Sequence, residues 1–208
     1  MIPQATKKRL PQYLRVLQEL KERGNKKVYS YQIGNMMEIS ETTVRKDFMF
    51  LNTVGKSAYG YDVSTLIKTL EQEMLINHQE KLVLIGVGSL GTALLKYNFM
   101  SNRIGKIVCG FDVDPQKVNK KNYGVPIHDM AMIHKKMPKN VSIALLAIPK
   151  EELDGVINQL INLKIQSFIN FSDGLPRKRK NVKVYSIDLV EAISKAIYEM
   201  KSKNTSLK

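Results

Sequence analysis

The chain shows two different patterns of apolar residues, one before and one after residue 80. In the first part, apolar side chains recur every three or four positions with charged side chains between them, a spacing typical of amphipathic helices. We expect these helices over residues 3–23, 31–37, 41–51 and 62–77. In the second part, short apolar runs alternate with helical or polar stretches, which predicts βαβ units and a parallel sheet. These runs cover residues 82–85, 104–111, 141–148, 165–171 and 182–187, with a helix expected over 151–163.

The two patterns predict an α/β protein with two domains. We expect a helical N-terminal domain over residues 1–77 and a Rossmann-like parallel-sheet domain over residues 78–188. The remaining residues, 189–208, read as an amphipathic helix followed by a polar tail. The apolar side of that helix needs a groove, either in its own subunit or in a neighbouring one.

Two details of the N-terminal domain can be predicted from helix chemistry. Pro11 should lie in the first turn of the main helix, or mark a break after a short leading turn, because a proline deeper inside costs about 3 kcal/mol. A second helix beginning after Ser30 should carry Ile33, Met36 and Met37 inward.

The third helix is the candidate nucleic-acid reader. Ser40 is a good N-cap, and Val44, Phe48 and Leu51 form its buried stripe. Two helices joined by a tight turn, with hydroxyls and cations on the second, match a helix-turn-helix whose second helix enters the major groove. A solvated helix face is the alternative. The side chains left for DNA are Thr42, Thr43, Arg45 and Lys46.

A short glycine-framed hairpin should follow this helix at residues 55–61, in the position of a wing. Lys56 and Tyr59 are its candidate DNA contacts. The net charge of +14 and the pI of about 9.7 also favour a polyanionic partner. The excess of Lys and Arg is spread over both domains, however, so the DNA prediction rests on the helix-turn-helix. The basic run at 176–181 could touch DNA or phosphate, or be a solvated loop.

The second candidate site is the sequence KLVLIGVGSLG, residues 81–91. Its glycines follow an expected strand and open an expected helix, the arrangement that binds a dinucleotide pyrophosphate at a helix N-terminus. Asp112 ends the next strand, 21 positions after Gly91, near the offset of a carboxylate that meets an adenosine ribose. Glycines that serve only packing are the alternative. The candidate cofactor residues are Gly86, Val87, Gly88, Ser89, Leu90, Gly91 and Asp112, with Ala147, Ile148, Pro149, Asn170 and Phe171 at the same sheet edge.

Composition narrows the remaining possibilities. No apolar stretch reaches the 18 residues of a membrane span and the N-terminus lacks an apolar signal core, so we expect a cytoplasmic protein without membrane attachment. Cys109 lies in an apolar run and reads as a buried hydrophobe. The three histidines have no metal-ligand spacing, and we expect no metal site.

With these residues in place, the chain resembles the Rex family of bacterial redox-sensing repressors from Ile2 almost to its C-terminus. The resemblance implies a homodimer that grips an inverted-repeat operator with paired winged helices and binds NAD(H) in its Rossmann domains. It also implies a C-terminal helix swapped into the partner subunit, DNA release by NADH and repression with NAD. The matching stretches are IPQATKKRLPQYLRVLQEL, ISETTVRKDF, VGKSAYGYDV, LIGVGSLGTALLKYNF, FDVDPQKV, YGVPI, LLAIP, INF and the final IDL.

The resemblance also assigns roles to single residues. It places Arg45 and Lys46 in the DNA-contacting helix and Lys56 and Tyr59 on the wing. Arg15, Tyr97 and Asp188 match residues of the family's switch. The chain departs from the family pattern near the cofactor and the swapped helix, which implies a weaker response to NADH; these positions are Ser89, Ser172, Asp173 and Ala192.

The sequence does not favour an enzyme. A small NAD- or CoA-binding Rossmann enzyme is the rival from another class, but no Ser/Tyr-x-x-x-Lys, Cys/His or paired-carboxylate constellation follows Asp112. A DNA-binding paralogue with weakened redox sensing is a third possibility.

Overall fold

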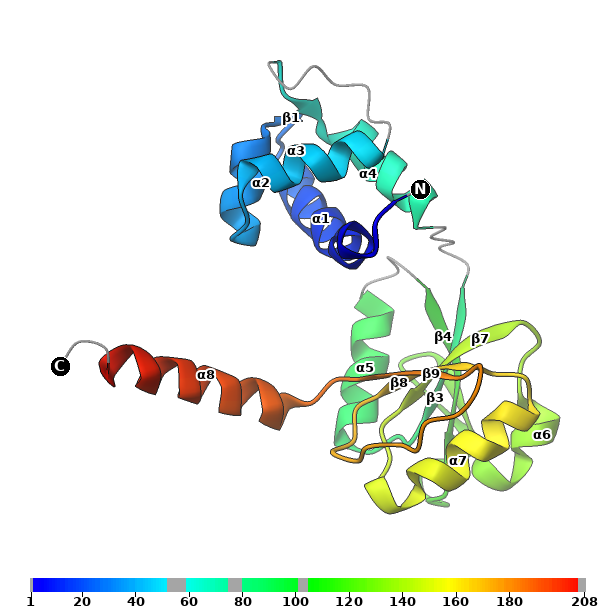
Figure 1. The fold of residues 1–208 in the computed structure, drawn as a ribbon. Coiled ribbons are helices and arrows are strands. Elements are labelled where there is room, and N and C mark those ends of the chain that lie inside the picture. Colours follow the sequence, from blue (N-terminus) through cyan, green and yellow to red (C-terminus); the bar gives the residue numbers. More distant parts are fainter. Residues whose placement is uncertain (1, 52–58, 75–79, 101–104, 206–208) are drawn as a thin grey trace. The chain divides into compact units, whose positions relative to one another are not determined.

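The computed structural model describes residues 2–51, 59–74, 80–100 and 105–205. The chain forms two compact units, Met1–Ile76 and Asn77–Lys208 (Figure 1). Each unit has its own apolar core, so each is described by itself.

Within its described residues, the first unit is a helical bundle with one small strand pair. The two strands are antiparallel, and Val28 lies opposite Tyr61. The expected wing at residues 55–61 falls largely outside the described residues, and only its end, from Tyr59, is seen. The elements are α1 (Gln4–Glu22), β1 (Lys27–Val28), α2 (Ser30–Met37), α3 (Glu41–Phe50), β2 (Tyr61–Asp62) and α4 (Val63–Glu73).

Pro11 lies well inside α1, so its prediction as a first-turn or break residue is wrong. Leu10, Tyr13 and Leu17 are all 4% exposed or less, and they form one stripe through the proline position. Burial of each such side chain contributes about 1.5–3 kcal/mol, which offsets the cost of the proline. Pro11 itself is exposed, so water can reach the carbonyl that lacks its helical partner.

Met36 is also placed differently from the prediction. It is 39% exposed, whereas Ile33 and Met37 are buried. The buried stripe of α2 includes Gly34 instead, because the chain turns back closely there: a Cβ on Gly34 would lie 2.7 Å from the Ile39 carbonyl oxygen. The buried side of α2 is therefore decided by the need for a small residue at this tight turn. The spacing of apolar residues alone does not show that need.

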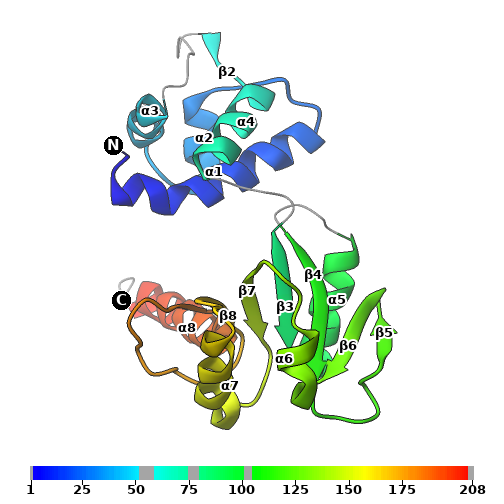
Figure 2. The same cartoon turned by 90° about the vertical axis from the view of Figure 1, so that its right-hand side faces the viewer.

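The second unit contains a seven-stranded sheet within its described residues, in the order β5-β6-β4-β3-β7-β8-β9 (Figures 1 and 2). All neighbouring strands are parallel except β5 and β6. The order reverses beside β3, which pairs with β4 on one side and β7 on the other. The strands are β3 (Lys81–Ile85), β4 (Lys106–Asp112), β5 (Lys120–Asn122), β6 (Val125–Asp129), β7 (Val141–Leu146), β8 (Ser167–Asn170) and β9 (Lys183–Ser186).

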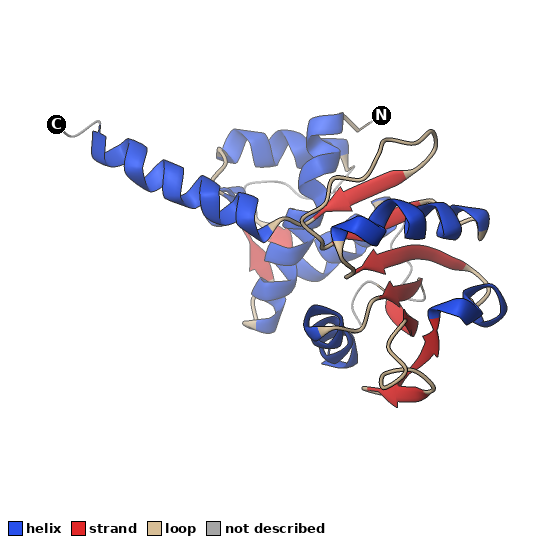
Figure 3. Ribbon diagram, turned by 90° about the horizontal axis from the view of Figure 1, so that it is seen from below, coloured by secondary structure: helices blue, strands red, loops and turns tan. Residues whose placement is uncertain are grey.

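Helices pack on both faces of this sheet (Figure 3). Leu95 of α5 (Ser89–Met100) packs in the core of one face, with Leu84 and Ile127 from the strands. Leu153 of α7 (Lys150–Asn162) and Ile133 of α6 (Ile133–Lys136) belong to the core of the other. Two opposed apolar faces explain why the central strands read as continuous apolar runs.

The sequence prediction missed β5 and β6. Val125 and Ile127 are buried, but Pro126 lies between them and argues against a strand. The proline is tolerated because β6 pairs with β4 from Ile127 onward, beyond Pro126. A 3₁₀ turn at Met130–Met132 then leads into α6.

The last helix, α8 (Leu189–Thr205), exposes its apolar side chains. Val190, Ile193, Ile197 and Met200 are 46–67% exposed. These residues recur at three- and four-residue spacing, so they form an uncovered stripe along the helix.

No helix among the described residues is long and apolar enough to cross a membrane.

Candidate nucleotide and nucleic-acid sites

The three glycines after β3 have three different environments. Gly86 has φ +88°, and a Cβ there would lie 2.3 Å from the Ala147 carbonyl oxygen. A Cβ on Gly91 would lie 2.1 Å from the Gly86 carbonyl oxygen. A Cβ on Gly88 would meet nothing within 4 Å. The first and third glycines are therefore required by the turn and by packing, and the second leaves space open above the start of α5.

Asp112 is bound to the glycine loop. Its Oδ2 accepts a hydrogen bond from the Val87 backbone N–H at 2.6 Å, and its Oδ1 accepts one from the Asp114 N–H at 2.8 Å. The Lys117 ammonium lies 3.9 Å from Asp112 Oδ2 and 3.2 Å from Asp114 Oδ2. A carboxylate has about four acceptor positions, so Asp112 can still accept from a ligand hydroxyl.

A cavity of about 540 Å³ opens at the carboxyl ends of β3, β4 and β7. This is the point where the strand order reverses, the usual ligand site of an open α/β sheet. Its volume lies in the range of small-molecule and cofactor sites, about 300–1,000 Å³. The predicted residues that line it are Gly86, Gly88, Asp112, Ala147, Ile148 and Pro149.

Other predicted cofactor residues surround the cavity without lining it. Val87 is 3% exposed and belongs to the sheet core, and Gly91 packs on the Gly86 carbonyl. Ser89 and Leu90 are exposed at the start of α5, where backbone N–H groups and the helix dipole favour an anion.

The far wall of the cavity was missed by sequence reasoning. It consists of four residues of α7 together with Val113, Lys117 and Met130. The helix itself was expected, but which of its sides faces the strand ends depends on how it packs across β7 and β8. The α7 residues are Glu152, Gly155, Val156 and Gln159.

Asn170 has a different role from the expected ligand contact. Its side chain is fully buried, and its Nδ2 donates to the Gly174 carbonyl at 2.9 Å and to Ser186 Oγ at 3.1 Å. Its Oδ1 accepts from the Ser172 N–H at 3.0 Å. Asn170 thus fixes the turn at residues 172–174, and neither it nor Phe171 lines the cavity. That turn places Asp173 within 3.7 Å of the Lys150 ammonium at the start of α7.

The predicted reader helix has the expected cap and core. The Ser40 hydroxyl accepts from the Thr43 N–H at 3.2 Å, and Val44, Phe48 and Leu51 are buried. Thr43 is partly covered, because its hydroxyl also pairs with Ser40.

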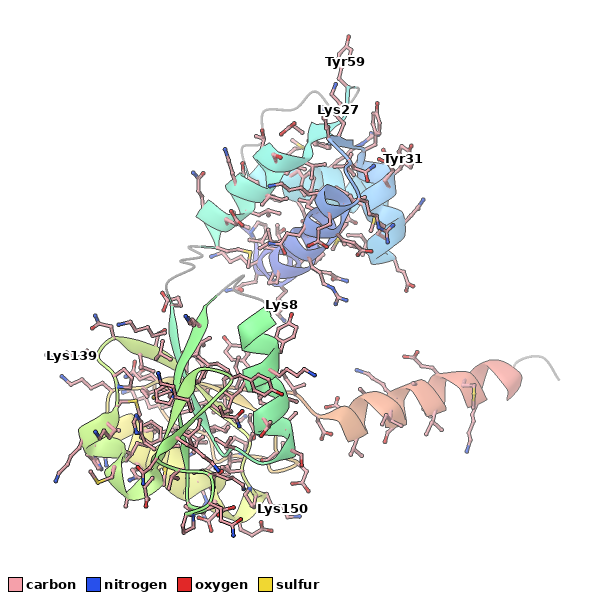
Figure 4. All side chains as sticks on the ribbon, turned by 180° about the vertical axis from the view of Figure 1, so that it is seen from behind. Lys8, Lys27, Tyr31, Tyr59, Lys139 and Lys150 are labelled. Carbon is pink, nitrogen blue, oxygen red and sulfur yellow. The ribbon has the colours of Figure 1, made fainter. Side chains whose placement is uncertain are left out.

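The remaining predicted DNA contacts are mostly exposed. Thr42, Lys46 and Tyr59 are exposed, and Lys56 lies outside the described residues. Figure 4 shows Tyr59 at the same end of the first unit as Lys27 and Tyr31. A surface of hydroxyl, cationic and aromatic groups is the chemistry expected at a nucleic-acid interface.

Arg45 is exposed but engaged. Its Nε donates to the Ser30 hydroxyl at 3.2 Å, and its Nη2 donates to Glu41 Oε1. The Ser30 hydroxyl donates to the same carboxylate oxygen at 2.9 Å. The reader helix and α2 are therefore joined by a closed polar triad of Ser30, Glu41 and Arg45.

A second polar network fixes the reader helix to α1, and sequence reasoning missed it. Asp47 accepts from Thr6 Oγ1, from the Tyr13 hydroxyl and from two nitrogens of Arg9, at 2.6–2.8 Å. Burial raises the pKa of Asp47, but the hydrogen bonds from Arg9, Tyr13 and Thr6 outweigh it and hold that pKa below its ordinary value. Tyr13, desolvated and donating to Asp47, has a raised pKa.

The three residues matched to the family's switch lie on different elements. Arg15 is exposed on α1, and Tyr97 is 66% exposed on α5. Asp188 caps the first turn of α8, because its Oδ1 accepts from the Val190 and Glu191 N–H groups at 2.8 and 3.0 Å.

The basic run at 176–181 is partly structural. Arg179 donates to Asp154 Oδ1 at 2.7 Å and to Asn158 Oδ1 at 2.9 Å, which attaches the loop to α7. The hydrogen bond from Arg179, followed by that from the Arg177 N–H, holds the pKa of Asp154 below its ordinary value. Arg177 remains 87% exposed.

Cys109 is buried in β4. Burial raises the pKa of its thiol to about 12, consistent with an inert packed side chain.

The fold and the two sites define a class: a helix-turn-helix unit joined in one chain to a Rossmann-like unit with a dinucleotide-type glycine loop. Comparison with known proteins agrees with this class. Residues 1–48 match the family described as putative DNA-binding protein N-terminus, and residues 77–174 match the CoA binding domain.

Curated relatives cover almost the whole chain. The redox-sensing transcriptional repressor Rex of Listeria welshimeri is 37% identical over 198 residues, 95% of this chain and 92% of its own. The Rex protein of Halalkalibacterium halodurans is also 37% identical, over 96% of this chain and 95% of its own. The chain therefore belongs to the Rex family of redox-sensing transcriptional repressors, as its motifs indicated; these relatives are named as repressors rather than enzymes.

Solved structures confirm the fold. The crystal structure of RSP, a Rex-family repressor, matches with a TM-score of 0.83 at 24% identity, over 99% of this chain and 96% of that one. RSP in complex with β-NAD⁺ and operator DNA matches with a TM-score of 0.84 at 24% identity, over 99% of this chain and 95% of that one. The predicted order of a helical reader followed by a Rossmann-like sheet is thus confirmed.

Proposed function

We propose that this protein is a transcriptional repressor that binds an inverted-repeat operator as a homodimer, carries NAD(H) in the 540 Å³ cavity and leaves DNA when NADH binds. The observation that carries the proposal is the 37% identity to named Rex repressors along 95% of the chain. That span includes both the reader helix and the glycine loop. As a chromosome-binding repressor, the protein would act in the cytoplasm.

The volume of the cavity and the glycine loop beside it support a dinucleotide as its ligand. The open space at Gly88 and the N-terminus of α5 would hold the pyrophosphate, and Asp112 would accept from a ribose hydroxyl. Ala147 and Pro149 would border the ligand at the end of β7. The cofactor supplies the redox signal, since its nicotinamide ring is cationic when oxidised and neutral when reduced, and the protein supplies binding and discrimination.

On the DNA side, the exposed positions of α3 would enter the major groove. Arg45 can present a bidentate edge to guanine, and Thr42 and Lys46 can reach phosphates. Tyr59, with Lys56 beyond the described residues, would contact DNA from the wing. Two such readers are needed for an inverted repeat, which requires a dimer.

The switch would couple the cofactor to the spacing of the two readers. Arg15, Tyr97 and Asp188 are its candidate residues, and α8 exchanged between subunits would supply the apolar contact that its exposed stripe lacks. A ligand shifts such an equilibrium only by its different affinity for the two states. NADH must therefore bind the DNA-released state more tightly than it binds the DNA-bound state, whereas NAD⁺ must show little such difference.

The direct test is a titration of the full-length protein against double-stranded DNA selected from a random pool, with NADH, NAD⁺ or neither. We expect sequence-specific DNA binding whose affinity is unchanged with NAD⁺ and lower with NADH. Specific binding unaffected by either nucleotide would assign the chain to a paralogue that has lost redox sensing, and absence of specific binding would reject the repressor function.

A second candidate ligand is coenzyme A, because residues 77–174 match a CoA binding domain. CoA shares the adenosine and pyrophosphate groups that the cavity would hold, but it carries an additional ribose 3′-phosphate. Calorimetric titration with CoA alongside NADH would discriminate them, and tighter binding of CoA would favour this second reading.

A further inference from the structure

Three surfaces stand outside the proposed cofactor and switch sites: the exposed tyrosines near β1, the basic loop on α7 and the Ser30–Glu41–Arg45 triad. Only the triad joins a buried polar group, an ion pair and a proposed DNA-contacting residue in one closed arrangement. Ser30 is 2% exposed, so the triad is anchored to the protein by a buried side chain.

We propose that Glu41 is a positioning residue for DNA recognition, which together with Ser30 holds the Arg45 guanidinium in one orientation and so restricts the DNA group that Arg45 contacts. The proposal rests on the proposed function, since it assumes that Arg45 meets DNA. The proposal gives Glu41 a role in sequence specificity, although its negative charge would repel a DNA phosphate.

The argument begins with the donors of the guanidinium. Arginine has five N–H groups in a planar fork, and two of its edges can make paired hydrogen bonds. Here the Nε–Nη2 edge faces the protein, because Nε donates to Ser30 and Nη2 donates to Glu41. The Nη1–Nη2 edge remains for a guanine or a phosphate.

The geometry also explains why an acidic residue is useful there. Glu41 is the first residue of α3, where a carboxylate is stabilised by the helix dipole. Arg45 lies one turn further along, at the i,i+4 spacing that favours a Glu–Arg pair. The pair is 39–51% exposed, so it contributes little to stability. Its main effect is to reduce the number of orientations that Arg45 can adopt.

Without Glu41, Arg45 keeps its charge but gains rotational freedom. Affinity for any DNA should then stay equal or increase, because one negative charge near the phosphates is lost. Preference for one sequence should fall, because a mobile guanidinium discriminates less between base edges. Glu41 could instead compete with DNA for Arg45, so that the ion pair must break before DNA binds. In that case Glu41→Ala should bind the operator more tightly, with an unchanged or increased preference for it.

The experiment uses the full-length protein and DNA selected from a random pool by the wild type. The ratio of dissociation constants for random and selected DNA is measured for wild type, Glu41→Ala, Glu41→Gln, Arg45→Ala and the Glu41→Ala/Arg45→Ala double variant. Glu38→Ala is the matched control, because Glu38 is an exposed acidic residue at the end of α2, three positions before Glu41, and its side chain makes no hydrogen bond or ion pair within the described residues.

We expect Glu41→Ala to lower the ratio by about fivefold or more, as loss of a bidentate contact does. Glu41→Gln, which keeps an acceptor oxygen, should retain most of the preference, and Glu38→Ala should retain all of it. The double variant should match Arg45→Ala, because Glu41 acts through Arg45.

Two results would overturn the proposal while leaving the repressor function intact. One is an equal loss of preference from Glu41→Ala with and without Arg45. The other is tighter operator binding by Glu41→Ala with an unchanged or increased ratio. Failure of the wild type to select any sequence would instead reject the proposed function itself.

Discussion

Asp112 Oδ2 accepts the Val87 backbone N–H at 2.6 Å, so the carboxylate that ends β4 also holds the glycine loop that follows β3. The two residues are 25 positions apart in the chain, and their strands are parallel neighbours in the sheet. One side chain therefore fixes the loop and offers its remaining acceptor positions to the cavity.

This arrangement predicts a preference for NADH over NADPH. NADPH carries a 2′-phosphate, which would lie beside the Asp112 carboxylate. At an effective dielectric constant of about 20, two like charges about 4 Å apart repel by about 4 kcal/mol, so even a screened part of this repulsion gives a preference of about tenfold or more. Asp112→Asn should reduce the preference in calorimetric titrations with the two nucleotides. Asp114→Asn, which removes a charge two positions away, should leave it nearly unchanged; equal effects of both variants would contradict a specific ribose contact.

The glycine loop predicts a separation of binding from folding. Gly88→Ala adds a methyl group to open space, so its unfolding temperature should stay close to wild type while NADH affinity falls by at least about tenfold, on the order of 1.4 kcal/mol. Gly86→Ala should destabilise the second unit, because its Cβ would meet the Ala147 carbonyl at 2.3 Å and its φ is +88°. Thermal unfolding followed with calorimetry distinguishes the two, and full NADH affinity in Gly88→Ala would place the pyrophosphate elsewhere.

These glycines and the Ser40 cap could be predicted from the sequence because neighbouring residues decide them. A strand that ends in Gly-x-Gly-x-x-Gly and a serine before a helix carry their function within a few positions. The hairpin of β5 and β6 is also local, but Pro126 hid it, since the pairing that tolerates a proline is set by β4.

The Asp47 network could not be predicted in the same way. Its donors Thr6, Arg9 and Tyr13 are 41, 38 and 34 positions away in the chain, so only the packing of α1 against α3 brings them together. Likewise, the wall of the cavity formed by α7 depends on which side of that helix meets the sheet.

The Asp47 network predicts acid-sensitive stability in the first unit. Asp47→Ala should lower the free energy of unfolding by about 3 kcal/mol, because it leaves the Arg9 fork and two hydroxyls without their acceptor. The folded pKa of Asp47 is depressed below its ordinary 3.8, so its contribution is complete above that pH and is lost as pH falls through the folded value. Urea unfolding at pH 7 and below pH 4 measures this. A difference between variant and wild type that stays constant down to pH 2 would contradict the assignment.

The uncovered stripe of α8 predicts a dimer held by this helix. Replacing both Ile193 and Ile197 with Gln should raise the dimer dissociation constant at least tenfold, since burial of each isoleucine contributes about 1.5–3 kcal/mol. Lys195→Gln is the control, because residue 195 lies on the opposite side of the helix. Sedimentation velocity measures the association. A dimer of unchanged stability after deletion of residues 189–208 would show that the subunits join elsewhere.

The last prediction concerns how the cavity region distinguishes NAD⁺ from NADH. Asp173 is one of the positions where the chain departs from the family pattern, and a carboxylate there, if it lies near the nicotinamide, would favour the cationic ring of NAD⁺. In the structure, however, Asp173 lies 3.7 Å from the Lys150 ammonium, which cancels part of its field.

Both side chains are more than half exposed, so solvent and salt reduce the remaining effect. Asp173→Asn should therefore lower the affinity for NAD⁺ relative to NADH by only about two- to fivefold, and Lys150→Met should change the ratio in the opposite direction by a similar factor. Calorimetry with both nucleotides at low and high salt tests this, because an electrostatic origin requires both changes to shrink as salt rises. Changes of the same sign in the two variants would show that the turn at residues 172–174 acts by its shape, fixed by Asn170, and not by the charge of Asp173.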